Sequence, residues 1–185
     1  MGDVVRPATL RDIPAITAIY AHHVRYGLAS FEWEPPTEAE MARRMQALLG
    51  QQQRYPYVVA ERDSGITGYA YVGPYRSRAG YCYAVEDSVY VKPGFQGCGL
   101  GKLLLSALLA ESTQLGFRQM VAVIGDSRNQ PSIALHQALG FHHAGVLKAV
   151  GFKGGQWLDV VLMQRALGEG STVLPNPATA HSAQS

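Results

Sequence analysis

Apolar residues recur every three or four positions along residues 9–27 and again along residues 37–49, a spacing typical of amphipathic helices. Thr37 and Glu40 fit a capping box at the start of the second helix, because each side chain can accept a hydrogen bond from the backbone amide of the other residue. A short apolar stretch at residues 4–8 predicts a strand before the first helix. The chain is therefore expected to begin with one strand and two helices.

β-Branched and aromatic residues favour strands in most of the remaining chain. Residues 98–116 and 130–140 instead have the dense apolar spacing of helices. The predicted strands span residues 55–62, 66–75, 80–91, 117–125, 143–152 and 156–164. The resulting order, βααβββαβαββ, predicts an α/β (α+β) fold with a mixed, mostly antiparallel central sheet flanked by helices on both faces.

The length and net charge of the chain limit the number of domains and the kinds of partner that we expect. Residues 1–167 are expected to form a single domain, because 185 residues leave little room for a second core. Residues 168–185 lack periodicity and are rich in small residues and proline, which predicts a disordered tail. A formal net charge of +2 favours neither nucleic acid nor an anionic membrane as partner. Without a signal peptide or an apolar run of about 18 residues, the expected location is cytoplasmic.

The cysteines and histidines do not predict a metal site. Cys82 and Cys98 are the two cysteines, and they lack ligand spacing, so we expect two reduced thiols. Adjacent histidines at 22–23 and at 142–143 have no acidic or cysteine partner at ligand spacing, and neighbouring side chains on one element point to different sides. We therefore expect no bound metal.

The segment AVEDSVYV, residues 84–91, carries two adjacent carboxylates in an apolar context. Burying a carboxylate is costly unless it is paired, hydrogen-bonded or protonated. Period-two alternation places Glu86 on one face of the strand and Asp87 on the other, with the valines. We expect a β-bulge near Ser88 that lets Asp87 leave the core face and frees backbone amides. A salt-bridged Glu86 at a strand edge is the structural alternative.

The segment VKPGFQGCGLGK, residues 91–102, leads from a strand through a glycine-rich turn into a helix. Backbone amides at a helix start, unblocked by side chains, favour an anion site. A P-loop would require Ser or Thr after Lys102, where Leu103 stands, and a dinucleotide-binding turn would require a different register. A glycine-rich helix start without a ligand is the remaining alternative.

The combination Gln96-x-x-Gly99-x-Gly101 at this junction resembles the signature of the GNAT family of N-acetyltransferases, and NQPSIALHQALGF at residues 129–141 is similar to a second family segment. The resemblance covers residues 4–166 and is tightest to the phosphinothricin acetyltransferase group, through segments such as YPYVVAE and GGQWLDV. It implies transfer of acetyl from acetyl-CoA to the α-amine of a small amino acid or analogue, such as phosphinothricin or methionine sulfoximine, by direct attack in a ternary complex.

The resemblance also implies roles for individual residues. Glu86 matches the general base, and a buried carboxyl with a raised pKa suits that task. His136 stands where the family has the residue that protonates the departing thiolate, although it could serve as a second base or as a packed helix residue. The residues expected to bind acetyl-CoA are Val89, Tyr90, Val91, Gln96, Gly97, Cys98, Gly99, Leu100, Gly101, Lys102, Asn129 and Ser132.

Substrate selection is expected from loops. Arg76 and Arg78 could grip a carboxylate or phosphinate, or could be solvated surface charges. Phe31 and Trp33 could wall the amino-acid pocket or pack against the sheet. The resemblance further implies a homodimer. Two alternatives remain open: acetylation of another amine, such as a protein N-terminus or a polyamine, and a non-catalytic acyl-CoA-binding sensor.

Overall fold

The computed structural model describes residues 2–50, 55–63 and 65–175. Its strands are β1 (Val4–Pro7), β2 (Tyr57–Arg62), β3 (Gly65–Pro74), β4 (Ala84–Val91), β5 (Gln119–Gly125), β6 (His142–Lys153) and β7 (Gln156–Ala166). Its α-helices are α1 (Ile13–Tyr26), α2 (Glu38–Leu49), α3 (Leu100–Gln114) and α4 (Gln130–Ala138). The predicted order βααβββαβαββ and the α/β fold class are confirmed.

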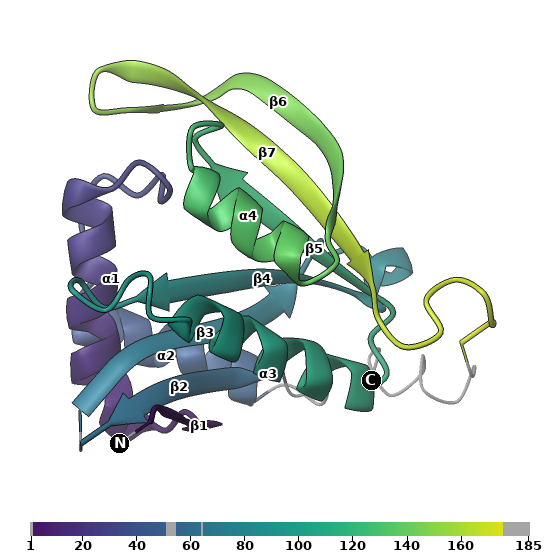
Figure 1. Cartoon of the computed structure of the whole chain (residues 1–185), viewed down its shortest axis with the longest axis horizontal. Helices are drawn as coiled ribbons and strands as arrows, with labels where there is room; N and C mark the ends of the chain where they lie inside the picture. Colours follow the sequence, from purple (N-terminus) through teal and green to yellow (C-terminus); the bar gives the residue numbers. More distant parts are fainter. Residues whose placement is uncertain (1, 51–54, 64, 176–185) are drawn as a thin grey trace.

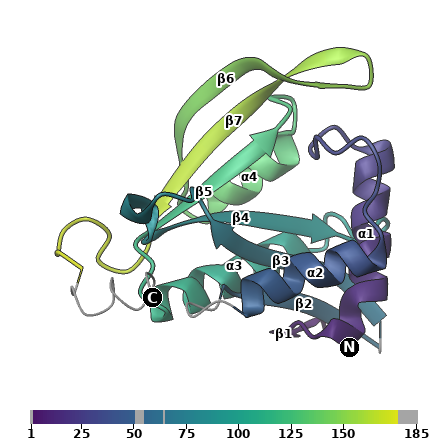
Figure 2. The same ribbon diagram turned by 180° about the vertical axis from the view of Figure 1, so that it is seen from behind.

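The strands form one sheet with the order β1-β2-β3-β4-β5-β7-β6. β4 and β5 pair in parallel and all other neighbours are antiparallel, so the sheet is mixed and mostly antiparallel, as predicted. Helices α3 and α4 cover one face of the sheet (Figure 1), and α1 and α2 cover the other (Figure 2).

Each face of the sheet has its own apolar core, and the alternation of side chains along the strands separates the two. Ala70 and Val72 of β3 pack with the leucines of α3, whereas Tyr69, on the same strand, packs with residues of α1 and α2 such as Ile16 and Met45. All five of these side chains are fully buried. The central strands are thus held on both sides, which fixes their register.

The sheet splits between β4 and β5. Their parallel pairing runs only from Ala84–Gln119 to Asp87–Ala122, and beyond it the two strands diverge (Figure 1). The register between β3 and β4 is continuous from Gly68–Val91 to Pro74–Val85. The β-bulge expected near Ser88 was therefore wrong, and Asp87 stays on the core face.

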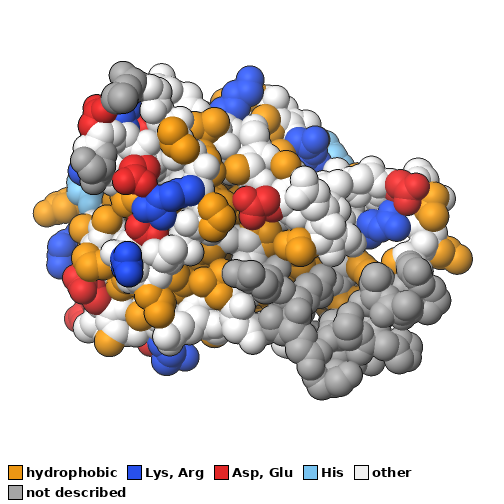
Figure 3. Space-filling view, turned by 90° about the horizontal axis from the view of Figure 1, so that it is seen from below, with side chains coloured by type: hydrophobic (Ala, Val, Ile, Leu, Met, Phe, Trp, Pro, Cys, Tyr) orange, Lys and Arg blue, Asp and Glu red, His pale blue; other side chains and the backbone are white. Residues whose placement is uncertain are grey.

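The remaining observations concern the surface and the chain end. Residues 168–171 form a turn, residues 172–175 have no regular structure, and residues 176–185 lie outside the described residues, so the predicted disordered tail stays a prediction. No helix in the described ranges is long and apolar enough to cross a membrane. Basic and acidic side chains are interspersed on the face shown in Figure 3, as a net charge of +2 would suggest.

Truncation of Leu104 should destabilise the fold. Its side chain is fully buried, and its Cδ1 lies 3.0 Å from the point where a Cβ on Gly68 of β3 would stand. We expect Leu104→Ala to lower the free energy of unfolding by about 2–5 kcal/mol, because the helix and sheet cannot close the cavity fully. Urea denaturation measures this loss.

Leu103→Ala is the matched control, since Leu103 is 41% exposed, and should change stability by only about 0.5 kcal/mol. Equal losses would contradict the assignment of the core.

Candidate active site

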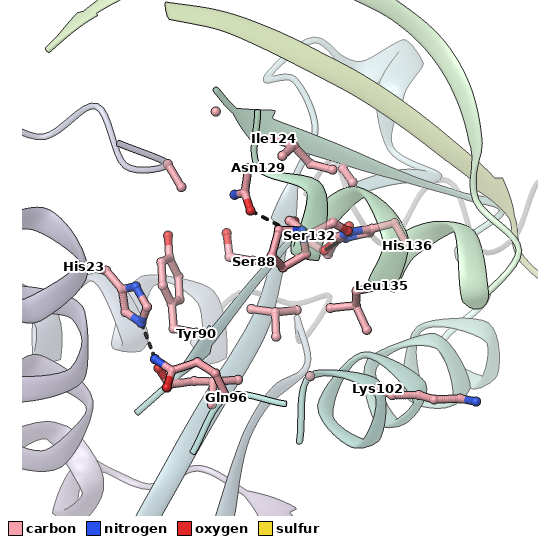
Figure 4. Close-up of a pocket in the computed structure, with 18 of the residues that line it drawn as sticks. His23, Ser88, Tyr90, Gln96, Lys102, Ile124, Asn129, Ser132, Leu135 and His136 are labelled. Carbon is pink, nitrogen blue, oxygen red and sulfur yellow. Dashed lines mark hydrogen bonds and ion pairs between the residues drawn. The ribbon is translucent and has the colours of Figure 1, made fainter. Parts of the chain in front are cut away.

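A cavity of about 510 Å³ lies where β4 and β5 diverge beyond the pair Asp87–Ala122, a region that we call the fork. The start of α3 and one side of α4 also line it, and α1 contributes His23 on the opposite side (Figure 4). The predicted cofactor-binding residues that line this cavity are Val89, Tyr90, Val91, Gln96, Gly97, Gly99, Gly101, Lys102, Asn129 and Ser132. Residues distant in sequence thus meet in one groove.

Two of the predicted cofactor-binding residues are not among those lining the cavity. The side chain of Cys98 is exposed, with its Sγ 3.7 Å from the carbonyl oxygen of Gln96. Leu100, the first residue of α3, is 2% exposed, and its side chain packs in the core. Any contact of these two residues with a ligand would involve their backbone, and their assignment stays a prediction.

The glycine-rich turn has the backbone geometry of an anion site. Gly94, Gly97 and Gly99 have φ angles of +84°, +77° and +82°, a conformation that residues with a Cβ rarely adopt. Gly99 is the N-cap of α3, and the Leu103 amide donates to its carbonyl at 3.0 Å. The amides of the helix's first turn before Leu103 lack intrahelical partners and can bind an anion.

The diverging end of β4 offers backbone groups to the cavity. Beyond Asp87, residues 88–91 have no pairing with β5, so the edge of β4 that β5 would otherwise cover faces the fork. The carbonyl oxygen of Val91 already accepts a hydrogen bond from Nε2 of His23, at 2.8 Å. Burial lowers the pKa of His23, although the bond to Val91 opposes this effect. Sequence reasoning considered His23 only as one of two adjacent histidines without metal-ligand spacing and so missed its place beside the cavity.

Glu86 is half-buried and lies on the sheet face that α1 and α2 cover, opposite Asp87. It does not itself line the cavity, but Ser88 and Tyr90, which share its face of the strand, do. Burial raises the pKa of Glu86, the negative charge of Asp87 raises it further, and Arg76 opposes both effects. A carboxyl with a raised pKa next to a cavity suits proton abstraction near neutral pH.

Asp87 and His136 form a buried pair on the other side of the fork. Asp87 is 7% exposed and His136 is 4% exposed, and Nε2 of the histidine lies 3.0 Å from Oδ2 of the carboxylate. Both residues line the cavity. Sequence reasoning missed this partner for Asp87; the available signal was the strand alternation, which had already placed Asp87 on the core face.

The predicted substrate-binding residues are more scattered. Arg76 is exposed, its guanidinium stacks over the ring of Tyr75 at 5.1 Å, and its charge acts on Glu86. Arg78 is exposed at the start of a short 3₁₀ turn. None of the four predicted residues lines the fork cavity in the described chain.

The two aromatic residues of the predicted substrate set lie toward the β6–β7 hairpin. Phe31 packs closely on Gly151 of β6, where an added Cβ would approach its ring to 2.6 Å. Trp33 is 75% exposed and lines a separate hollow beside Phe152 and Lys153. Lys153 links the β6–β7 hairpin to α1 and to the loop that follows α1. Its Nζ donates to the carbonyl oxygens of Val24 in α1 and Ser30 in the loop, at 2.8 and 2.6 Å.

Comparison with known proteins gives consistent results. The model of the acetyltransferase (GNAT) family matches residues 20–141. A phosphinothricin N-acetyltransferase of Alcaligenes faecalis is 53% identical over 89% of this chain and 82% of its own. An L-methionine sulfoximine/L-methionine sulfone acetyltransferase of Salmonella typhimurium is 42% identical over 89% of this chain and 95% of its own. The crystal structure of a phosphinothricin acetyltransferase from Sinorhizobium meliloti in complex with AcCoA has a TM-score of 0.91 at 48% identity, covering 96% of this chain and 95% of that one.

Proposed function

Because the chain belongs to the acetyltransferase (GNAT) family, we propose that it transfers the acetyl group of acetyl-CoA to the α-amine of a small amino acid of the phosphinothricin or methionine sulfoximine type. The observation that carries this proposal is the fork between β4 and β5. It joins a helix start suited to a diphosphate with a strand that carries a carboxyl of raised pKa. The use of acetyl-CoA also supports a cytoplasmic location.

The residues of the fork fit acetyl-CoA as a substrate. The first turn of α3 and the amides of Gly97 and Gly99 can donate to the diphosphate, and Lys102, which lines the same cavity, adds a positive charge. The uncovered edge of β4 at residues 88–91 can bond the amide groups of the extended pantetheine arm, as a neighbouring strand would. Asn129 and Ser132, at the start of α4, face it from the other side. The residue set requires no metal.

Glu86 is the proposed general base. An α-ammonium group must lose a proton before its nitrogen can attack a thioester, and the raised pKa of Glu86 favours taking up that proton, directly or through a water molecule. The nitrogen then forms a bond to the acetyl carbon as the bond from that carbon to sulfur breaks, without a covalent acetyl-enzyme. The leaving thiolate needs a proton, and His136, which lines the fork, is the proposed donor.

The acceptor is proposed to lie on the Glu86 side of β4. Arg76 is the best-supported contact for its carboxylate, because the charge of Arg76 already acts on Glu86. Arg78, Phe31 and Trp33 remain proposed contacts. Like Arg76, they lie outside the fork cavity, so contact with an acceptor in the fork needs a movement of their loops or a second subunit.

A thiol-release assay with acetyl-CoA and a panel of amines tests the proposed activity. We expect turnover with methionine sulfoximine or phosphinothricin, and much less with polyamines or with a peptide that has a free N-terminus. Turnover confined to those other amines would overturn the proposed acceptor. Binding of acetyl-CoA without acetylation of any amine would instead identify a sensor and overturn the proposed activity.

Replacement of the base should separate catalysis from binding. We expect Glu86→Gln to lower kcat by about 10²–10⁴-fold while acetyl-CoA affinity, measured by calorimetry, stays within about twofold. In the wild type, kcat/KM should fall as the pH drops through the raised pKa of Glu86, and this acidic limb should vanish in the variant. Because a raised pKa means that the fold disfavours the charged carboxylate, Glu86→Gln should be at least as stable as the wild type at neutral pH.

Glu111 provides the matched control for this experiment. Burial raises the pKa of its carboxyl as well, but it lies on α3 beside a different cavity. Glu111→Gln should leave the rate and the pH profile unchanged. A Glu86→Gln variant that loses acetyl-CoA affinity as much as rate would show that Glu86 has a structural role instead.

A homodimer is proposed from the exposed apolar surface of the β6–β7 hairpin. Large apolar side chains are solvent-exposed there, namely Val146, Leu147, Val150, Phe152 and Trp157. An exposed apolar patch of this kind is typical of an interface.

Light scattering should give about twice the chain mass of 20.0 kDa. Leu147→Asp should shift the protein toward monomer, and Leu115→Asp, at a residue of similar exposure beyond α3, should not. A wild type that is monomeric at micromolar concentration would refute the dimer.

A further inference from the structure

The Asp87–His136 pair has a feature that the proposed activity does not use. Both ring nitrogens of His136 already face oxygen acceptors. Nδ1 lies 2.7 Å from the carbonyl oxygen of Ser132, one turn earlier in α4, and Nε2 lies 3.0 Å from Oδ2 of Asp87. A carbonyl oxygen can only accept a hydrogen bond, and an ionised carboxylate can only accept as well.

With Asp87 ionised, the two acceptors require two N–H donors, so this arrangement fits the imidazolium form of His136. In that form, neither nitrogen has a lone pair with which to accept a proton. The ring geometry therefore argues against His136 as a second base. It leaves two roles, a proton donor and a purely structural tie between α4 and β4.

We propose that Asp87 is a positioning residue that keeps His136 doubly protonated at the fork, so that His136 delivers the Nε2 proton to the departing thiolate. This inference rests on the proposed acetyl transfer, and it assigns to Asp87 a part in that reaction. Asp87 acts through the histidine. The departing sulfur has to replace Oδ2 as the acceptor of the Nε2–H bond, and the proton then moves from Nε2 to sulfur.

The proton balance of the step is complete. As the carbon–sulfur bond breaks, its electron pair stays on sulfur, and His136 gives the sulfur the Nε2 proton. The products are a thiol and a neutral imidazole whose Nε2 lone pair faces the carboxylate of Asp87. That arrangement is repulsive, so His136 recovers a proton from solvent, while Glu86 releases to solvent the proton that it took from the ammonium group. The nitrogen loses its second proton to solvent as the neutral amide forms, so each turnover releases one net proton. The enzyme thus returns to its starting state.

The surroundings of the pair favour this state. Burial by itself lowers the pKa of His136, but the hydrogen bond and charge of Asp87 and the Ser132 carbonyl outweigh burial and raise it. The ring of Phe141, just before β6, packs edge-to-face on the histidine at 4.9 Å. Glu86, the other carboxyl near the pair, lies on the opposite face of β4. Among the charged groups in the described chain, Asp87 is thus the one that faces the imidazole.

The second carboxylate oxygen of Asp87 points to a ligand at this position. Oδ1 is buried and has no hydrogen-bond partner within the described residues. A buried polar atom without a partner is unusual in a folded protein. Because Asp87 lines the cavity, a thiol or a water molecule held in the fork can supply the missing donor.

Asp87→Asn tests the proposal through the pH profile of kcat. The amide keeps the shape of the carboxylate but lacks its charge, so the pKa of His136 should fall. A general acid is active when protonated, so the rate falls as the pH rises through its pKa. We expect the alkaline limb to move to lower pH, with kcat at pH 8.5 reduced at least about tenfold and KM for acetyl-CoA changed by less than about threefold. An alkaline limb that stays in place would overturn the proposal.

Asp12→Asn is the matched control. Asp12 is also 7% exposed and is also ion-paired, because its Oδ1 accepts a hydrogen bond from the partly exposed guanidinium of Arg6 at 2.8 Å. This variant should lose stability without moving either limb of the profile. Its behaviour separates the general effect of removing a buried carboxylate from the specific effect on His136.

Nitrogen NMR of the unmodified protein provides a test that needs neither a variant nor an acceptor. The two ring nitrogens of His136 should both show the chemical shifts of protonated imidazole at pH 7.5, before any substrate is added. A neutral His136 signal at that pH would overturn the proposal even if the thiol-release assay succeeds. Conversely, the protein could show a doubly protonated His136 and yet acetylate no amine. That result would refute the proposed function but not the proposed protonation of His136 beside Asp87.

Discussion

The site depends on the short pairing between β4 and β5. The two strands share four residue pairs, up to Asp87–Ala122, and then separate. A strand that loses its neighbour exposes backbone donors and acceptors, which must be satisfied by water or by another chain. In this fold, the space that opens is covered by α4 on one side and α1 on the other, so it becomes a cavity and not a free sheet edge. The groove opens where the two strands part, and the turn before α3 and the buried pair both line it.

The fork also explains why a buried ion pair is retained in an otherwise apolar core. Replacing a buried pair by packed hydrophobic residues is often neutral or stabilising, so stability alone does not account for Asp87 and His136. The pair stands where the paired part of the two strands ends, and it joins the last turn of α4 to β4 across that point. Its apolar neighbours, Val85 and Phe141 among them, pack in the same core as α3. The proposed role of His136 as a proton donor gives the pair a function that stability alone does not require.

Local chemistry allowed much of this arrangement to be predicted from the sequence. The glycine-rich turn was recognisable because positive φ angles and exposed amides require glycine at particular positions, and Gly97 and Gly99 have those angles. The order of elements followed from hydrophobic periodicity. The bulge near Ser88 was wrong because alternation shows which face a side chain occupies but not what lies against that face. The partner of Asp87 is 49 residues away on another element, and no local pattern encodes such a contact.

The adjacent carboxylates of β4 illustrate how one strand can supply two opposite environments. Period-two alternation sends Glu86 toward α1 and α2 and Asp87 toward α3 and α4, although the two residues are neighbours in the chain. Burial and the charge of Asp87 raise the pKa of Glu86 against the opposing charge of Arg76, whereas Asp87 is bonded to a histidine. A thioester lying in the fork would have a proton acceptor on one side of the sheet and a proton donor on the other. If Glu86 and His136 act as proposed, the proton that leaves the amine and the proton that reaches the sulfur are handled on opposite faces of this strand.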